Sequence, residues 1–247
     1  MYYQLISATN PSIGKWQNQL KEQSYLYISS NEVQKVMRDI FPDYQQGLSD
    51  FLQSWFNLAI DKFMADGGTY RERTHAVFSS SVKKKLINKL PYQPHFQTKY
   101  YNSLNGDVPR YFEEIPENVL NNKVFSALLK MAHLLFSGID YKNYYIEAHQ
   151  FRINAKVGIE GLPTPEGVHR DGVRFVMMVM VSRENIQGGI TTIYDLNKKE
   201  LSQFTLKNIL DIAIVDDQKV FHGVSPIYKE NLEKNYAYRD VLVITFK

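Results

Sequence analysis

Residues 143–247 contain seven short runs rich in β-branched and aromatic residues, which predicts a mainly β fold. Turn signals such as Gly188-Gly189 and Asp216-Asp217 separate these runs, as they separate the strands of a sandwich. Upstream of residue 143, apolar residues instead recur with helical spacing. Together these observations predict a jelly roll, or double-stranded β-helix of the cupin-like type, whose two antiparallel sheets are supported by N-terminal helices.

Three helices are expected in the first half of the chain, each with apolar residues along one stripe. Their expected ranges are 31–41, 49–64 and 122–137. The residues expected to end them are Pro42, Gly67-Gly68 and Gly138. Asn31 is the candidate N-cap of the first helix. Between the helices, residues 70–78 are expected to be extended, and residues 93–115 to form strands and turns.

The predicted strands of the C-terminal half are short and follow one another closely. Their expected ranges are 144–153, 173–182, 190–196, 201–206, 211–215, 219–224 and 241–246. No repeat, low-complexity segment or linker interrupts the pattern, so residues 1–247 are expected to form a single domain. Within it, residues 1–142 would supply helical support and outer strands, and residues 143–247 the jelly-roll core.

Composition excludes several classes of function. The chain has no cysteine, which excludes disulfides, iron–sulfur clusters and thiol nucleophiles. Its net charge of +3 gives a weak electrostatic field, and the basic run Lys83-Lys84-Lys85 is expected to be a solvated helix face, so no nucleic-acid partner is expected. The apolar run 175–181 is too short to span a bilayer, and residues 1–5 lack the pattern of a signal peptide. A cytoplasmic protein without membrane contact is therefore expected.

His169 and Asp171 are the first candidate site residues. On a strand, residues two apart point to the same face, so both side chains would project into one space. Taken alone, such a pair is more often found at the end of a surface strand. His222 lies in an apolar run that a jelly roll brings back beside His169, although a histidine there can also be a hydrogen-bonded core residue. Two imidazoles and one carboxylate can occupy three positions around iron(II), which leaves three positions for other ligands.

Arg239 is the fourth candidate, because an arginine at the start of an apolar strand is costly to bury unless it is paired. Asp240 or water could neutralise it. A dicarboxylate co-substrate is a better partner beside a metal site, since guanidinium and carboxylate form two parallel hydrogen bonds. Thr245 shares the strand face of Arg239 and could add a hydroxyl contact.

Two alternating polar groups are candidates for substrate recognition. Arg71, Arg73 and His75 would share one strand face and could bind a substrate carboxylate. Gln150 and Arg152 form the second group, just before the predicted metal strand. A solvated sheet face, or support for the metal ligands, is at least as good an interpretation of each group. Arg71, Arg73 and Gln150 are kept as the predicted substrate contacts.

Five stretches of the second half carry a family resemblance. They are His149-Gln150-Phe151-Arg152, Gly167-Val168-His169-Arg170-Asp171-Gly172, Gly188-Gly189, the run from Gln218 to Pro226, and the run from Arg239 to Phe246. Their order and spacing resemble the bacterial 2-oxoglutarate–iron dioxygenases that include the free-amino-acid hydroxylases, isoleucine 4-hydroxylase among them, and proteins linked to biofilm and stress responses. The resemblance implies iron ligation by His169, Asp171 and His222, and 2-oxoglutarate anchoring by Arg239. Ile153 departs from the pattern, because relatives place a tyrosine near the co-substrate there.

The resemblance implies an iron(II)- and 2-oxoglutarate-dependent dioxygenase that uses O2 to hydroxylate an unactivated C–H bond of a small substrate. A free L-amino acid is the expected substrate, and succinate and CO2 are the expected co-products. Related halogenases lack the carboxylate ligand, so Asp171 favours hydroxylation. The alternatives are a non-catalytic stress- or biofilm-related protein on the same fold, a dioxygenase acting on a peptide, nucleic acid or other small molecule, and a metal-dependent isomerase. The sequence leaves the substrate, the attacked carbon and the oligomeric state open.

Overall fold

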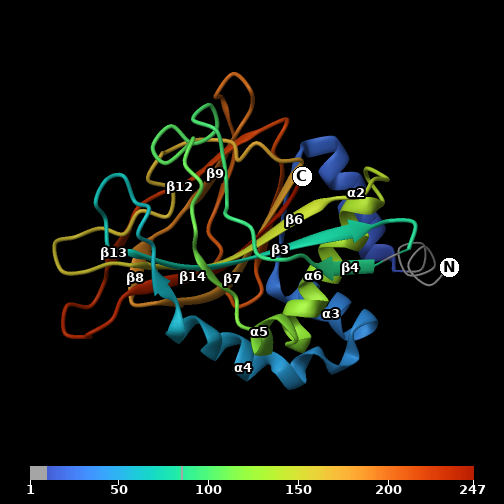
Figure 1. Cartoon of the computed structure of the whole chain (residues 1–247), viewed down its shortest axis with the longest axis horizontal. Helices are drawn as coiled ribbons and strands as arrows, with labels where there is room; N and C mark the ends of the chain where they lie inside the picture. The colour runs from blue at the N-terminus through green and yellow to red at the C-terminus, as the bar shows by residue number, and fades with distance from the viewer. Residues whose placement is uncertain (1–9, 85) are drawn as a thin grey trace.

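A large antiparallel sheet with helices on one face and a smaller sheet on the other forms the protein in the computed structural model (Figure 1). The structure describes residues 10–84 and 86–247. The expectations for residues 1–5 and for Lys85 lie outside the described residues. Lys83 and Lys84 lie in a turn and not on the predicted helix face. The mainly β fold with supporting helices is confirmed.

The large sheet has nine strands in the described part of the chain. In order across the sheet, seven of them are β1 (Tyr25–Ile28), β11 (Ile212–Asp216), β7 (Phe175–Glu184), β14 (Tyr238–Phe246), β6 (Tyr145–Asn154), β3 (Arg71–Ser81) and β2 (Ala59–Ile60). The other two, β4 (Leu86–Lys89) and β5 (Glu113–Glu114), pair with β3. Only β5 runs parallel to its neighbour within this sheet. The C-terminal strand β14 therefore lies in the middle of the sheet, between β6 and β7.

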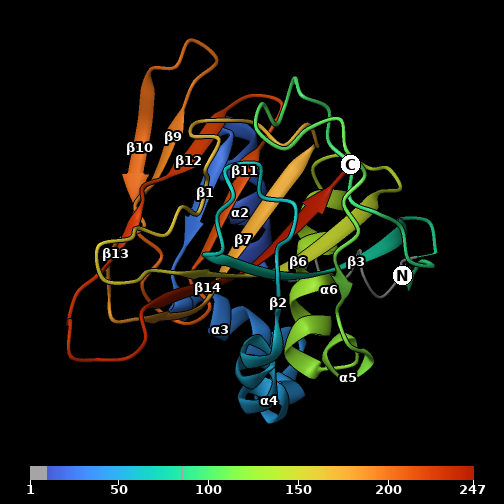
Figure 2. The same cartoon turned by 60° about the vertical axis from the view of Figure 1, so that its left-hand side comes forward.

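Two small sheets complete the β structure of the described residues. The first contains β10 (Glu200–Phe204), β9 (Thr191–Tyr194) and β12 (Phe221–Val224). Figure 2 shows these three strands side by side, away from the helices at the bottom of the view. The second sheet pairs β13 (Ile227–Lys229) with β8 (Ile186–Gly188). The sheets are open, and the three-stranded one packs through Ile193 against the large sheet.

Strand β7 shows how the two faces of the large sheet are used. Phe175, Met177 and Val179 belong to the apolar cluster that the helices cover. Val176 and Met178 alternate with them and pack toward the three-stranded sheet. Because both faces are covered, the strand reads as a continuous apolar run instead of alternating with polar residues. Side chains on the second face are the ones that can line a site between the sheets.

The helices pack on the first face of the large sheet. They are α2 (Pro11–Gln23), α3 (Ser30–Ile40), α4 (Leu48–Gln53), α5 (Glu117–Leu120) and α6 (Lys123–Ser137). The N-cap of α3 is Ser29, which forms a capping box with Glu32, and the predicted cap Asn31 lies inside the helix. The helix ends before Pro42, as predicted. Asn122 caps α6 by accepting a hydrogen bond from the backbone N–H of Val124, so the helix predicted at 122–137 is confirmed. No helix among the described residues is long and apolar enough to cross a membrane.

The prediction of a helix at 49–64 is wrong beyond its first turns. Helix α4 ends at Gln53, a 3-10 turn covers Ser54–Asn57, and β2 follows. Ala59 pairs with Arg73 of β3, so strand pairing overrides the helical spacing of the apolar residues. The sequence reasoning also missed α2 and β1, the strand at one edge of the large sheet.

Candidate active site

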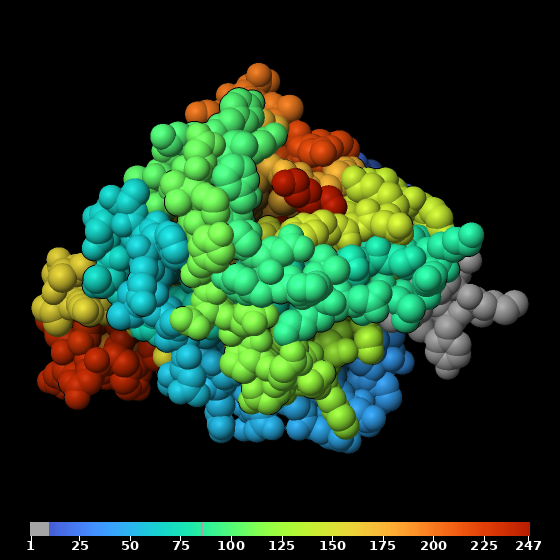
Figure 3. Space-filling view, viewed as in Figure 1, coloured from blue at the N-terminus to red at the C-terminus, as the bar shows by residue number. Residues whose placement is uncertain are grey.

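The second face of the large sheet lines a cavity of about 230 Å³. Strands β3, β6 and β14 form its floor, and residues 95–102 and 163–173 form much of its wall. Figure 3 shows this side of the molecule, where red atoms of the C-terminal residues lie in a hollow beside the green segment around residue 100. A cavity of this size suits a small molecule more than a folded partner.

His169, Asp171 and His222 come together at this cavity, as expected. His169 and Asp171 do not lie on a strand, however, but in a loop segment that pairs with β12 only at His169. The backbones of His169 and His222 exchange two hydrogen bonds, of 2.9 and 3.0 Å, which fixes the two imidazoles side by side. The Nε2 atom of His169 lies 3.4 Å from Oδ1 of Asp171, and the Nε2 atom of His222 lies 3.5 Å from Oδ2. One ligand atom from each residue lies within 4.8 Å of the others, so the three can contact one metal ion.

The backbone fixes the ring orientation of His169. Its Nδ1 lies 3.0 Å from the carbonyl oxygen of Gly167. A carbonyl only accepts, so Nδ1 carries the proton and Nε2 keeps its lone pair for a metal.

Asp217 and Gln97 hold the segment that carries Asp171. The buried carboxylate of Asp217 accepts hydrogen bonds from the backbone N–H groups of Asp171, Gly172 and Val173, at 2.8–3.1 Å. The side-chain amide of Gln97 donates to Oδ1 of Asp171 at 3.2 Å. Gly172 has a φ of +79°, and a Cβ there would lie 2.5 Å from the ring of Tyr101. The carboxylate is therefore placed by its surroundings before any metal binds.

The two histidines and Asp171 shift one another's pKa values. Burial raises the pKa of Asp171, but hydrogen bonds with His169 and His222 outweigh it and hold the pKa well below its usual range. Burial lowers the pKa of His222, but hydrogen bonds with Asp171 and Asp217 raise it to about 10. A metal that binds this group must therefore displace a proton.

Arg239 points into the cavity from β14, while Asp240 points to the opposite face. Asp240 is held by Arg152 through hydrogen bonds of 2.8 and 2.6 Å, so it does not neutralise Arg239. Arg239 is only 5% exposed, and its Nε and Nη2 atoms have no hydrogen-bond partner among the described residues. Burial and the nearby Arg183 lower the pKa of Arg239 to about 10.

Thr245, on the same strand face as Arg239, has a buried hydroxyl that also lacks a partner in the described structure. This end of the cavity offers donors for an anion.

Arg71 and Arg73 reach the cavity from β3, as predicted. The Nε atom of Arg71 donates to Asp61 at 2.8 Å, and Nη2 of Arg73 lies 2.9 Å from Nδ1 of His149. Burial and the nearby Arg71 hold the pKa of Arg73 well below its usual value. Arg110, which sequence reasoning did not single out, lines the same region.

Gln150 requires a correction, because it faces away from the cavity. Its side-chain amide donates to Ser54 at 2.8 Å and accepts from Thr74 at 2.8 Å, on the face that the helices cover. Fully buried and satisfied there, it has no access to a substrate. Its strand neighbours His149 and Phe151 line the cavity instead.

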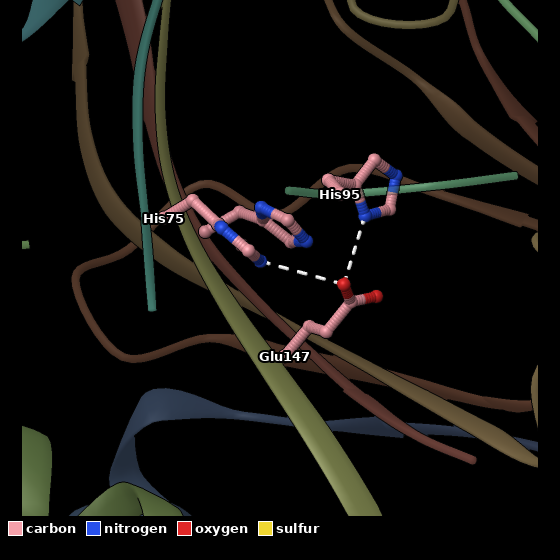
Figure 4. A group of neighbouring side chains, drawn as sticks. His75, His95 and Glu147 are labelled. Atoms are coloured by element: carbon pink, nitrogen blue, oxygen red, sulfur yellow. Dashed lines mark hydrogen bonds and ion pairs between the residues drawn. The ribbon is translucent and has the colours of Figure 1, made fainter. Parts of the chain in front are cut away.

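A second group of side chains could also hold a metal: His75, His95, Glu147 and His149. Figure 4 shows His75 and His95 pointing at the carboxylate of Glu147. The Oε1 atom of Glu147 lies 3.4 Å from Nε2 of His75 and 3.1 Å from Nδ1 of His95. Burial raises the pKa of Glu147, but hydrogen bonds with the two histidines lower it overall, so the carboxylate is ionised. Sequence reasoning missed Glu147 and His95. It placed His75 with Arg71 and Arg73 on one strand face, and the structure adds that β3 and β6 pair with His75 opposite His149.

Comparison with known proteins places the chain in a family. The model of the 2OG-Fe dioxygenase family matches residues 52–245, and the chain belongs to this family. Membership implies iron(II), 2-oxoglutarate and O2 as its cofactor and co-substrates.

Curated relatives and solved structures agree with the family. The 3(1)-hydroxy-L-isoleucine 4-dioxygenase of Pantoea ananatis is 25% identical over 92% of this chain and 93% of its own. The L-isoleucine-4-hydroxylase of Bacillus thuringiensis is 26% identical over 86% and 89%. The crystal structure of a bsmA homologue from Methylobium petroleophilum is 31% identical, with a TM-score of 0.85 over 95% of this chain and 92% of that one. The structure of IDO from Bacillus thuringiensis, 21% identical, has a TM-score of 0.79 over 95% and 98%.

Proposed function

We propose that the protein is an iron(II)- and 2-oxoglutarate-dependent dioxygenase that hydroxylates an unactivated C–H bond of a free L-amino acid, with release of succinate and CO2. One observation carries the proposal: the cavity that His169, Asp171 and His222 line also receives the unpartnered N–H groups of Arg239. We further propose that residues 1–247 form a single domain, with the two facing sheets of residues 143–247 as its jelly-roll core and residues 1–142 as support.

His169, Asp171 and His222 are the proposed iron ligands, in preference to the group around Glu147. Near Glu147, Arg73 lies 2.9 Å from His149, and Arg71 and Arg110 act on the same region. A unit positive charge about 5 Å from a dication costs about 7 kcal/mol at an effective dielectric constant of about 20. A dication is therefore disfavoured beside these arginines. No arginine hydrogen-bonds to either iron-binding imidazole among the described residues.

The proposed roles of the remaining residues follow from their positions. When bound, iron(II) supplies the oxidative chemistry that decarboxylates 2-oxoglutarate and cleaves the substrate C–H bond. Arg239 binds the far carboxylate of 2-oxoglutarate, with each charge-assisted hydrogen bond worth about 1.5–3 kcal/mol, and Thr245 adds a hydroxyl contact. Val241 and Val243 line the cavity between them and exclude water. Asp171 occupies the position that a halide would need, which favours hydroxylation.

The substrate class rests on the cavity and on the relatives. A volume of about 230 Å³ suits a small molecule, and Arg71 and Arg73 provide positive charge for a carboxylate. Two relatives that match most of the chain are named for L-isoleucine or its hydroxylated form. These observations favour a free amino acid over the alternatives of a peptide substrate or a non-catalytic protein.

Succinate release against a panel of free L-amino acids tests the proposal, with mass spectrometry for the gain of one oxygen atom. We expect one aliphatic or polar amino acid to stimulate turnover well above the uncoupled background. A weak visible charge-transfer band should form when iron(II) and 2-oxoglutarate are added anaerobically. If the charge-transfer band forms but no amino acid stimulates turnover, the substrate is a peptide or another small molecule. If the band does not form, the dioxygenase assignment is wrong.

Iron(II) binding is expected to strengthen as the pH rises. The pKa of about 10 for His222 means that its ring holds a proton which the metal must displace. The apparent affinity should rise by about tenfold per pH unit between about pH 6 and about pH 8. Anaerobic metal titration at three pH values measures this slope, and an affinity independent of pH would show that the metal displaces no proton from His222.

The substitution Asp217→Asn is expected to weaken iron binding by about 10- to 100-fold, as is typical of residues that orient metal ligands. The amide that replaces the carboxylate would accept with one oxygen only, whereas both oxygens of Asp217 accept backbone hydrogen bonds, so the segment carrying Asp171 would lose part of its support. The exposed Asp39→Asn on α3 is the matched control. Equal dissociation constants for iron(II) in both variants would show that Asp217 does not position the site.

A further inference from the structure

Glu166 lies on the wall of the cavity, and one of its two carboxylate oxygens has no partner among the described residues. Its side chain is 11% exposed, and its Oε1 atom lies 3.4 Å from Nε2 of His169. The Oε2 atom is buried and has no hydrogen-bond partner among the described residues. A buried carboxylate oxygen that accepts no hydrogen bond is costly, so such an atom at a cavity marks a place for a donor.

His169 does not provide that donor once iron is bound. Its Nδ1 donates to the carbonyl of Gly167, which leaves Nε2 with a lone pair directed at the iron position. Neither oxygen of Glu166 then accepts a hydrogen bond from the described protein. The donor must come from a molecule in the cavity.

Unpartnered donors for an anion lie in the same cavity. The Nε atoms of Arg73 and Arg110 are buried and have no hydrogen-bond partner in the described part of the chain. Arg71 pairs with Asp61 at 2.7 Å, whereas Arg73 approaches Asp61 only to 3.7 Å. Arg110 donates to Gln97 through Nη2, so its Nε atom and that of Arg73 remain available. Arg239 is a separate donor group, which the proposed function assigns to 2-oxoglutarate.

The cavity carries charges of both signs, which favours a substrate that does the same. Four arginines line it, Arg71, Arg73, Arg110 and Arg239, together with Lys247. The carboxylates of Glu147, Glu166 and Asp171 also line it. A zwitterion can meet groups of both signs, whereas a simple carboxylic acid would leave the unpartnered oxygen of Glu166 without a donor.

We propose that Glu166 binds the protonated amine of the substrate, while Arg73 and Arg110 bind its carboxylate. This inference rests on the proposed function and makes Glu166 the residue that selects amino acids over acids without an amine. The ammonium group donates the hydrogen bond that Oε2 lacks, and each end of the zwitterion meets a group of opposite charge.

The test compares two ligands in two variants. The ligands are the most active member of a panel of the twenty proteinogenic L-amino acids and the carboxylic acid obtained when hydrogen replaces its amine. The variants are Glu166→Gln and the exposed control Glu233→Gln. Calorimetry on the anaerobic protein loaded with iron(II) and 2-oxoglutarate gives dissociation constants without turnover.

Glu166→Gln is expected to weaken amino-acid binding by about 10- to 150-fold, the effect of one charge-assisted hydrogen bond. Binding of the acid without an amine should change by less than about twofold, so the selectivity should collapse. A merely structural role would weaken both ligands together. The Glu233→Gln control should keep the wild-type selectivity.

Each other outcome overturns the inference in a recognisable way. Unchanged selectivity in Glu166→Gln shows that Glu166 does not bind the amine. Loss of the iron–2-oxoglutarate band in that variant shows that Glu166 belongs to the metal site. If no amino acid of the panel stimulates turnover but the wild type still forms the iron–2-oxoglutarate band, the protein is a dioxygenase with another kind of substrate. If the wild type forms no band, the proposed function itself is wrong.

Discussion

Replacing Arg239 with leucine is expected to weaken 2-oxoglutarate binding by at least about 100-fold, because two charge-assisted hydrogen bonds are lost. The Nε and Nη2 atoms of Arg239 are buried without partners in the described structure, so the substitution breaks no hydrogen bond of these atoms within the described protein. Anaerobic titration of the charge-transfer band, with iron(II) in excess, measures the effect.

Two variants separate the charge of Arg239 from its shape. Arg239→Lys keeps a cation but not the two-pronged geometry, and should lie between wild type and Arg239→Leu. Arg38→Leu, on the exposed side of α3, should bind 2-oxoglutarate as the wild type does. If Arg239→Leu binds 2-oxoglutarate as tightly as the wild type does, Arg239 does not bind the co-substrate. Full enzymatic activity in that variant would favour a metal-dependent isomerase.

Asp171→Ala is expected to lower amino-acid-stimulated turnover by at least about 1,000-fold, a larger effect than the roughly 10- to 100-fold typical of residues behind the ligands. The substitution removes the only carboxylate within the proposed ligand set and leaves two imidazoles to hold a dication. Succinate release under saturating iron(II) gives the residual rate. Asp39→Ala is the control on the protein surface, and substantial turnover in Asp171→Ala would mean that the metal has another carboxylate ligand.

The convergence of His169, Asp171 and His222 was predictable because it depends on local rules. Residues two apart on an extended segment share a face, and a jelly roll returns its last strands beside the segment that carries His169. Arg239 was predictable for a similar reason, since a charged side chain at the start of an apolar strand requires a partner. The structure adds that Asp240 is not this partner, because it pairs with Arg152 on the opposite face.

The face of Gln150 was not predictable. Both faces of β6 are covered, so buried polar residues occur on both and the sequence lacks the alternation that would show which face meets the cavity. The register with β3 decides the matter by placing Thr74 opposite Gln150 and His75 opposite His149. A shift of one residue would have exchanged the two faces. Ile153 lies on the cavity face, and its side chain offers no hydroxyl there.

That His95, Gln97 and Arg110 line the cavity was not predictable either. They lie in an irregular segment whose path depends on single contacts, such as the bond from Arg110 to Gln97 at 2.9 Å, and not on periodicity. The helix predicted at 49–64 failed because β2 pairs with β3 instead, and such long-range pairing leaves no signal in a local window.

Metal content after anaerobic loading distinguishes the two groups of side chains that could hold iron. We expect about one equivalent of iron(II) in the wild type and in His95→Ala, because the proposed site does not include the group around Glu147. The double variant His169→Ala/His222→Ala should retain no iron after gel filtration. Iron that remains in the double variant but is lost from His95→Ala would contradict the proposed ligands and place the metal at His75, His95 and Glu147.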